Sequence, residues 1–265
     1  MNIEEPAKKV PIIHETEVLV VGSGPGGLAA ALGAARAGSQ VTLLERFGCF
    51  GGNITAVGVE GFAWYRHEKT VEAGGLAFEY EQRAVESNAA VPESQSKSYE
   101  LDSEGFKVVA DDLVLEAGVR PMLHRAFCAP ILEGEEIKGV ITESKAGREA
   151  IIGKIIIDAT GDADVARRSG VRVFKNNKED MISASVMFHM SGVNKEEFMN
   201  EIERDPQKYS DWSDKNWQVQ TSGKEDDMFS PFLRKPFEKA KDSGCLLYTS
   251  PSPRDATLSR MPSSA

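Results

Sequence analysis

Residues 17–45, EVLVVGSGPGGLAAALGAARAGSQVTLLE, decide the fold. The apolar run at 17–21 predicts a parallel strand that is buried on both faces. A helix is expected next, because Pro25 suits a first helical turn and Gly38 suits a helix end. Residues 41–45 predict a second strand. Strand, helix and strand in succession form a βαβ unit, so the sequence predicts an α/β fold with a Rossmann-like parallel sheet.

The glycines of this segment form the pattern G-x-G-x-x-G between the strand and the helix. In such a unit the first glycine allows a tight turn, the second lets the backbone approach a pyrophosphate, and the third lets the helix pack on the strand. The helix N-terminus offers amide groups and a partial positive charge to the anion. The predicted dinucleotide-binding residues are therefore Gly22, Ser23, Gly24, Pro25, Gly26 and Gly27.

Glu45 ends the second predicted strand, 23 residues after Gly22. A carboxylate at this position can accept hydrogen bonds from both ribose hydroxyls of an adenosine, and it would repel the 2′-phosphate of NADP. Neither Glu45 nor the glycine pattern separates FAD from NAD.

The rest of the chain is expected to complete the sheet and to begin a second domain. Residues 47–61 predict a loop, and helical spacing at 75–88 and 106–117 predicts a helical insertion at about 62–117. The segments 119–131, 137–144 and 148–160 predict the strands of a β-meander, and 161–170 a short helix. Residues 182–190 alternate and are expected to open a substrate or cap domain.

Three stretches resemble one family in their order and spacing: LVVGSGPGGLAAA at 19–31, LLERFGCFGGNIT at 43–55 and IIIDATGDADVARRSGV at 155–171. Over about residues 17–192 the chain is similar to FAD-dependent oxidoreductases, the glutathione-reductase-like flavoproteins with two dinucleotide-binding motifs. The resemblance implies FAD as the cofactor, because an aspartate at the place of Asp162 binds the ribitol in that family. Asp162 can alternatively cap the following helix.

The resemblance also extends the set of cofactor-binding residues. The loop at 51–53 would pass close to the pyrophosphate and flavin, and Phe127 would meet the adenine through its backbone. Arg46 either flanks the adenosine or is a solvated charge. The additional residues implied by the resemblance are Arg46, Gly51, Gly52, Asn53, Phe127, Thr160, Gly161 and Asp162.

Composition excludes several other classes of function. The formal net charge of −10 argues against nucleic acid and anionic membranes as partners. No run of eighteen apolar residues predicts a spanning helix, and the N-terminus lacks the apolar core of a signal peptide. The three scattered cysteines indicate a reducing compartment, so a cytoplasmic location is expected. No cluster has the spacing of metal ligands.

Several reactive residue types are expected to be structural. Cys49 has no second cysteine within five residues, which favours a small neutral filler over dithiol chemistry. His124 is expected on a strand and Cys128 is expected to be buried. The aromatic cluster at 62–67 either packs in the core or lines a substrate cavity.

The predicted domains are an FAD-binding domain at 1–170, part of a substrate or cap domain at 171–244, and an artefactual, disordered tail at 245–265. The tail can be encoded by DNA that resembles sequencing adapter, which implies that the gene was cut near Gly244. The predicted function is an FAD-dependent oxidoreductase that transfers hydride or electrons with a small organic substrate. An NAD-binding dehydrogenase and a flavin-carrying electron-transfer subunit with a partner protein remain alternatives. The sequence assigns no catalytic residue.

Overall fold

The computed structural model describes residues 3, 6–61, 66–67, 71–72, 74–92, 99–177, 181, 192–194 and 196–197, without the side chains of 66–67 and 71–72. Two compact units divide the chain: Met1–Glu93 with Lys97–Phe174, and Ser94–Ser96 with Lys175–Ala265. In the second unit, the amide of Glu197 donates to Asn194 Oδ1 at 3.2 Å. All helices and strands described below belong to the first unit.

A six-stranded sheet in the order β7-β2-β1-β10-β9-β8 organises the first unit. Strands β7, β2, β1 and β10 are parallel, and β9 and β8 continue the sheet antiparallel as a meander. This arrangement confirms the predicted fold class. The strands are β1 Ile12–Val21, β2 Val41–Leu44, β7 Arg120–Met122, β8 Ala126–Glu133, β9 Glu136–Ser144 and β10 Gly147–Asp158.

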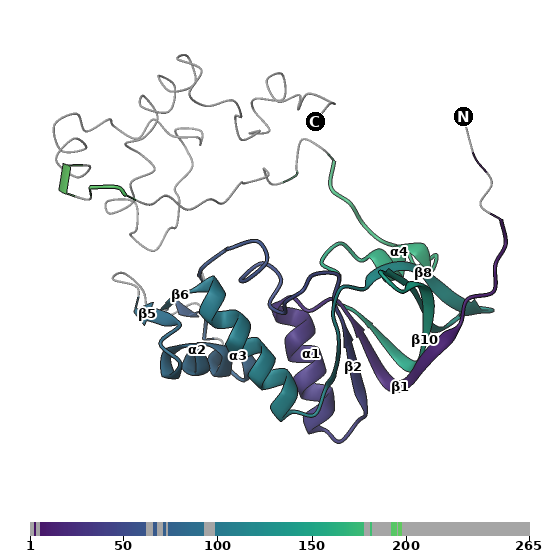
Figure 1. Cartoon of the computed structure of the whole chain (residues 1–265), viewed down its shortest axis with the longest axis horizontal. Helices are drawn as coiled ribbons and strands as arrows, with labels where there is room; N and C mark the ends of the chain where they lie inside the picture. The colour runs from purple at the N-terminus through teal and green to yellow at the C-terminus, as the bar shows by residue number, and fades with distance from the viewer. Residues whose placement is uncertain are drawn as a thin grey trace, which may run out of the picture. The chain divides into compact units, whose positions relative to one another are not determined.

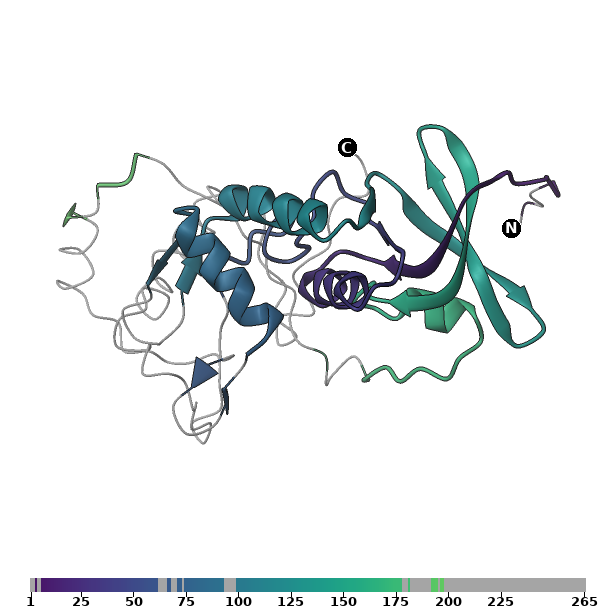
Figure 2. The same cartoon turned by 90° about the horizontal axis from the view of Figure 1, so that it is seen from below.

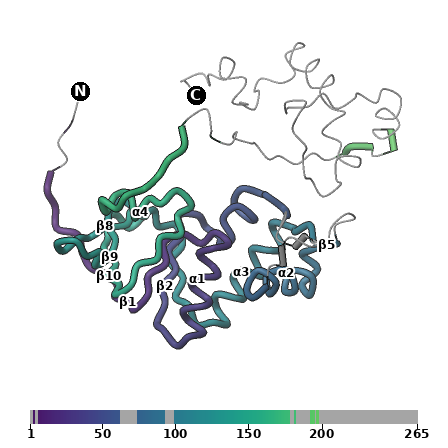
Figure 3. Tube along the Cα trace, turned by 180° about the vertical axis from the view of Figure 1, so that it is seen from behind, coloured from purple at the N-terminus to yellow at the C-terminus, as the bar shows by residue number. Residues whose placement is uncertain are grey.

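Helices α1, α2 and α3 lie together on one side of the parallel strands, and α4 lies with the meander (Figures 1 and 3). Figure 2 shows α1 nearly along its axis, between the strands and α3. Two short antiparallel pairs of strands form two further sheets, separate from the six-stranded one. The helices are α1 Pro25–Arg36, α2 Leu76–Glu86, α3 Ser103–Glu116 and α4 Asp164–Arg168, and the short strands are β3 Arg66–His67, β4 Val71–Glu72, β5 Ala90–Pro92 and β6 Tyr99–Leu101.

Alternate residues at the end of β1 serve two different cores, which is why its last four residues, Val18–Val21, are all apolar. Val18 and Val20 face the helical layer, where Leu28 and Leu32 of α1 are fully buried against the sheet. Leu19 and Val21 belong to the core on the opposite side, beneath the meander and α4. The parallel strands are thus covered on both faces, as an α/β sheet requires.

Helix α3 begins at Ser103, earlier than the predicted residue 106. The cause is Asp102, whose Oδ1 accepts hydrogen bonds from the amides of Glu104 at 2.8 Å and Gly105 at 3.0 Å. This side chain satisfies two of the free N–H groups of the first helical turn. Phe106 of α3 then meets Tyr80 of α2 edge to face, with ring centroids 6.0 Å apart.

The single strand predicted at 119–131 is wrong, because this segment divides into β7 and β8. His124 lies between them with φ +54° and is exposed, so it is not a strand residue. Its amide donates to Phe47 O at 3.0 Å, and the amide of Arg125 donates to Glu45 O at 2.9 Å. These bonds to the loop after β2 turn the chain out of the parallel sheet and into the meander.

Other predictions fall where the structure is not described. The alternating segment 182–190, the aromatic residues 62–65 and the segment 245–265 all lie outside the described residues, as does the side chain of His67.

Glu81 of α2 should make the stability of the fold depend on pH. Its side chain is buried, and burial raises its pKa from 4.5 to about 7. Since the unfolded chain ionises first, this group lowers the free energy of unfolding as pH rises from about 4.5 to about 7. The stability advantage of Glu81→Gln over the parent should therefore be larger at pH 8 than at pH 5. The midpoint of urea denaturation, measured for both proteins at both pH values, tests this.

Glu86→Gln is the matched control, because Glu86 is exposed on the same helix. A Glu81→Gln difference of equal size at both pH values would contradict this account.

Candidate dinucleotide-binding site

The glycine-rich turn after β1 packs directly on the end of β10. Gly22 has φ +98°, and a Cβ on it would lie 2.4 Å from Ala159 O. A Cβ on Gly27 would lie 2.0 Å from Gly22 O and 3.1 Å from the Ala159 Cβ. Both positions therefore require glycine for the packing of turn, helix and strand.

Gly24 and Gly26 are different, since a Cβ on either would meet nothing within 4 Å. The first bonded amide of α1 is that of Leu28, which donates to Gly24 O at 2.9 Å. Pro25 has no N–H, and within the described part of the chain no acceptor is assigned to the amides of Gly26 and Gly27. An open backbone with amides left over at a helix N-terminus fits the pyrophosphate of a dinucleotide.

The loop at 51–53 lies against the same turn. The amide of Gly51 donates to Ser23 O at 2.9 Å, and a Cβ on Gly52 would lie 2.7 Å from the Gly24 Cα. Gly51 and Gly52 both have positive φ, at +106° and +54°. The structure thus brings this loop to the proposed pyrophosphate position, while Asn53 is exposed at its edge.

Glu45 reaches back from the end of β2 to the turn. Its Oε2 accepts from the amide of Ser23 at 2.9 Å and from the Ser23 hydroxyl at 2.6 Å. Its Oε1 accepts from the amide of Phe47 at 2.9 Å. Glu45 therefore lies beside the glycine-rich turn, joined to it by hydrogen bonds.

The turn after β10 is ordered by Asp158, to which the sequence analysis gives no role. Asp158 Oδ1 accepts from the amide and hydroxyl of Thr160 at 3.1 and 2.7 Å, and Oδ2 accepts from the amide of Ala166 at 2.9 Å. Thr160 Oγ1 in turn accepts from the amide of Asp164 at 2.9 Å. An aspartate directly before a Thr-Gly turn is a signal for such side-chain bonding.

Asp162 is exposed and does not cap α4. The N-cap is Ala163, with φ +56°, and the first amides of the helix are bonded by Thr160 and Asp158 instead. The capping alternative for Asp162 is therefore wrong. Its carboxylate remains at the surface, next to the open backbone of Gly161.

Two arginines lie over aromatic rings near the ends of the sheet strands. Arg46 is 4.7 Å from the ring centroid of Phe47, and both side chains are exposed directly after Glu45. Arg168 of α4 is 5.6 Å from the ring of Phe127 and donates to the carbonyl of Cys128. Phe127 lies two residues after Arg125, whose amide binds Glu45 O.

The two described cysteines are both half-buried. Cys49 Sγ lies 3.8 Å from Thr55 Oγ1, close to the 51–53 loop. Cys128 is less buried than predicted, because its strand β8 is the outer strand of the meander. Within the described residues no group of three or more His, Cys, Asp and Glu side chains could hold a metal ion, and no helix is long and apolar enough to cross a membrane.

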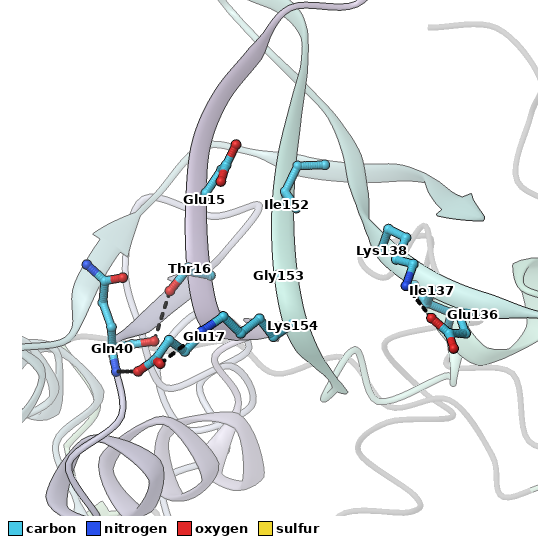
Figure 4. Close-up of a pocket in the computed structure, with 10 residues that line it drawn as sticks. All are labelled: Glu15, Thr16, Glu17, Gln40, Glu136, Ile137, Lys138, Ile152, Gly153 and Lys154. Atoms are coloured by element: carbon cyan, nitrogen blue, oxygen red, sulfur yellow. Dashed lines mark hydrogen bonds and ion pairs between the residues drawn. The ribbon is translucent and has the colours of Figure 1, made fainter. Parts of the chain in front are cut away.

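A separate pocket of about 760 Å³ lies at the opposite edge of the sheet, where β2 begins (Figure 4). Four of its charged residues form two ion pairs: Lys154 Nζ lies 3.2 Å from Glu17 Oε1, and Lys138 pairs with Glu136. Glu17 Oε2 also accepts from the amide of Gln40 at 3.0 Å. None of the residues that line this pocket belongs to the glycine-rich turn. The pocket is therefore separate from the candidate dinucleotide site.

The family model described as FAD dependent oxidoreductase matches residues 17–259 of the chain. The chain belongs to this family. The match covers all segments of the site described above and extends into the segment 245–265. The predicted family and its cofactor FAD are thereby confirmed.

Curated relatives include thiamine thiazole synthases. The protein from Saccharolobus islandicus strain L.S.2.15 / Lassen #1 is 29% identical over 163 residues, which are 57% of this chain and 57% of that protein. The protein from Metallosphaera sedula is 29% identical over 161 residues, 56% of this chain and 55% of the relative. The chain thus spans somewhat more than half the length of these relatives.

Solved structures with a similar arrangement include a geranylgeranyl bacteriochlorophyll reductase-like protein from Thermoplasma acidophilum. It has a TM-score of 0.48 and 20% identity, and the match covers 63% of this chain and 45% of that one. THI4 from Thermovibrio ammonificans has a TM-score of 0.45 and 21% identity, with 60% and 64% covered.

Substitution by alanine should have little effect on stability at Gly24 and a large effect at Gly27. Gly24→Ala places its methyl group in open space with a φ of −59° that alanine adopts, so the unfolding temperature should stay within about 2 °C of the parent. Gly27→Ala drives a methyl group into Gly22 O and should destabilise the fold by about 3 kcal/mol. Thermal unfolding without FAD measures both, and equal effects would contradict the packing described for Gly27.

Asp158 and Asp162 should differ in their contribution to stability. Asp158→Ala leaves the amides of Thr160 and Ala166 without their acceptor and should lower the free energy of unfolding by about 2 kcal/mol. Asp162→Ala changes an exposed side chain and should leave that free energy within about 0.5 kcal/mol. Denaturant titration without FAD compares them, and an equal loss in both variants would show that Asp158 does not order the turn.

Proposed function

We propose that the chain is the FAD-binding part of an oxidoreductase that acts on a small organic substrate. The observation that carries the proposal is the open backbone of Gly24 and Gly26, flanked by the amides of α1 and by the 51–53 loop. Bound FAD supplies the hydride or electron transfer itself. The protein provides the binding, orientation and charge around the cofactor.

Four parts of the cofactor, namely the pyrophosphate, the adenosine ribose, the ribitol and the adenine, have matching residues in this proposal. The amides of Gly26 and Gly27 bind the pyrophosphate, since they lie at the positive end of α1. Glu45 accepts from the adenosine ribose, and the exposed carboxylate of Asp162 accepts from the ribitol. The backbone near Phe127 and the side chain of Arg46 border the adenine.

The resulting arrangement spans one edge of the parallel sheet. Gly22, Glu45 and Ala159 follow the carboxyl ends of three neighbouring parallel strands, β1, β2 and β10. In open α/β sheets, ligands bind at this edge. The common placement of three chemically suited segments supports a single extended dinucleotide along it.

The proposed domain organisation is an FAD-binding domain at 1–170, with a helical insertion at about 62–117, followed by a substrate or cap domain at 171–244. The division of the chain near residue 174 supports the first boundary. We also propose a cytoplasmic location, on the basis of the scattered cysteines.

The proposal predicts that the purified protein binds FAD and that Gly24→Val abolishes this binding. A valine at this open position fills the space that the pyrophosphate needs, so affinity should fall at least about 100-fold, or about 2.8 kcal/mol. Titration followed by flavin fluorescence measures the affinity for FAD, and a parallel calorimetric titration measures that for NAD.

Gly33→Val is the matched control, because it places the same side chain in open space farther along α1. It should bind FAD as the parent does. Tight binding of NAD without binding of FAD by the parent, or equal FAD affinity in parent and Gly24→Val, would refute the proposal.

A further inference from the structure

The carboxylate of Glu45 is already engaged by the protein itself. Three donors reach it from two residues: the amide and hydroxyl of Ser23 on Oε2, and the amide of Phe47 on Oε1. A carboxylate oxygen has two lone pairs for hydrogen bonds. Ser23 therefore fills both acceptor positions of Oε2, while Oε1 keeps one position for another donor.

Burial makes these bonds important for the stability of the fold. Glu45 is 6% exposed and Ser23 is 0% exposed. A carboxylate that is withdrawn from water must receive hydrogen bonds, and a buried amide that loses its acceptor is penalised by its own desolvation. The Ser23–Glu45 contact is thus a stabilising contact of the protein before any ligand binds.

The contact also connects segments that are far apart in the sequence. Ser23 lies in the turn after β1, and Glu45 follows β2. The carbonyl of Ser23 accepts from the amide of Gly51, while the amide of Gly22 donates to Leu44 O at 2.9 Å. Ser23 is therefore the residue at which the glycine-rich turn, the end of β2 and the 51–53 loop are joined.

We infer that Ser23 is a positioning residue: its hydroxyl fixes the carboxylate of Glu45 and thereby holds the glycine-rich turn in its binding conformation in the absence of FAD. The ribose is then received by Oε1, the oxygen with a remaining acceptor position. This last consequence rests on the proposed function, whereas the role of Ser23 in the free protein does not.

Thermal unfolding of the 265-residue chain, prepared without flavin, tests the inference in three variants. Ser23→Ala removes the hydroxyl and keeps the amide. Glu45→Gln places an NH₂ group against N–H donors that need an acceptor. Each should lower the unfolding temperature, by about 3–10 °C for a domain of this size. The double variant should lose less than the sum of the single losses, because both remove the same interaction.

Ser39→Ala and Glu17→Gln are matched controls. Ser39 lies shortly before the start of β2. Glu17 makes an ion pair with Lys154 in which the side chains are 46% and 75% exposed, respectively. Both variants should unfold within about 2 °C of the parent. For Glu17→Gln the reason is that solvent-accessible ion pairs contribute little to stability.

The readout separates this inference from the proposed function. If Ser23→Ala and Glu45→Gln unfold at the parent's temperature without FAD, or if their losses simply add, the inference is wrong even when both bind FAD weakly. If the parent fails to bind FAD but the two variants are destabilised and coupled, the proposed function fails and the role of Ser23 stands. Should Glu45→Gln not fold, Ser23→Ala in comparison with Ser39→Ala decides the question.

Discussion

The close approach of the glycine-rich turn to the end of β10 is the constraint on which the rest of the site depends. Because Gly22 and Gly27 have no side chains, the turn can rest against Ala159 and the helix α1 can begin within the core. The parallel pairing of β1 with β2 and β10 places the carboxyl ends of these strands side by side. The groups proposed to bind the pyrophosphate, ribose and ribitol are thereby collected along one edge of the sheet.

Two carboxylates at strand ends hold this edge together. Glu45 binds the turn that follows the neighbouring strand β1, and Asp158 binds the turn that follows its own strand β10. In both cases the side chain accepts from backbone amides in the turn. The amides of Gly26 and Gly27 are left over at the start of α1, so the protein satisfies its own turns and keeps these donors for an anion.

Local patterns in the sequence predict much of this arrangement. The βαβ unit and the packing roles of Gly22 and Gly27 follow from apolar runs and glycine spacing, which act over a few residues. The break at His124 could not be predicted in this way, because it depends on hydrogen bonds to the distant loop after β2. The Ser23–Glu45 contact is likewise a long-range contact, and the place of Asp162 comes from family resemblance rather than from spacing.

The central claim is that the glycine-rich turn is assembled before FAD binds and that its free amides receive the pyrophosphate. Residue-resolved amide hydrogen exchange, with and without FAD, tests it most directly. The account predicts that the Ser23 amide, bonded to Glu45, exchanges slowly in both states, while the amides of Gly26 and Gly27 exchange fast alone and slowly with FAD. Fast exchange at Ser23 in the free protein, or no protection of Gly26 and Gly27 by FAD, would contradict it.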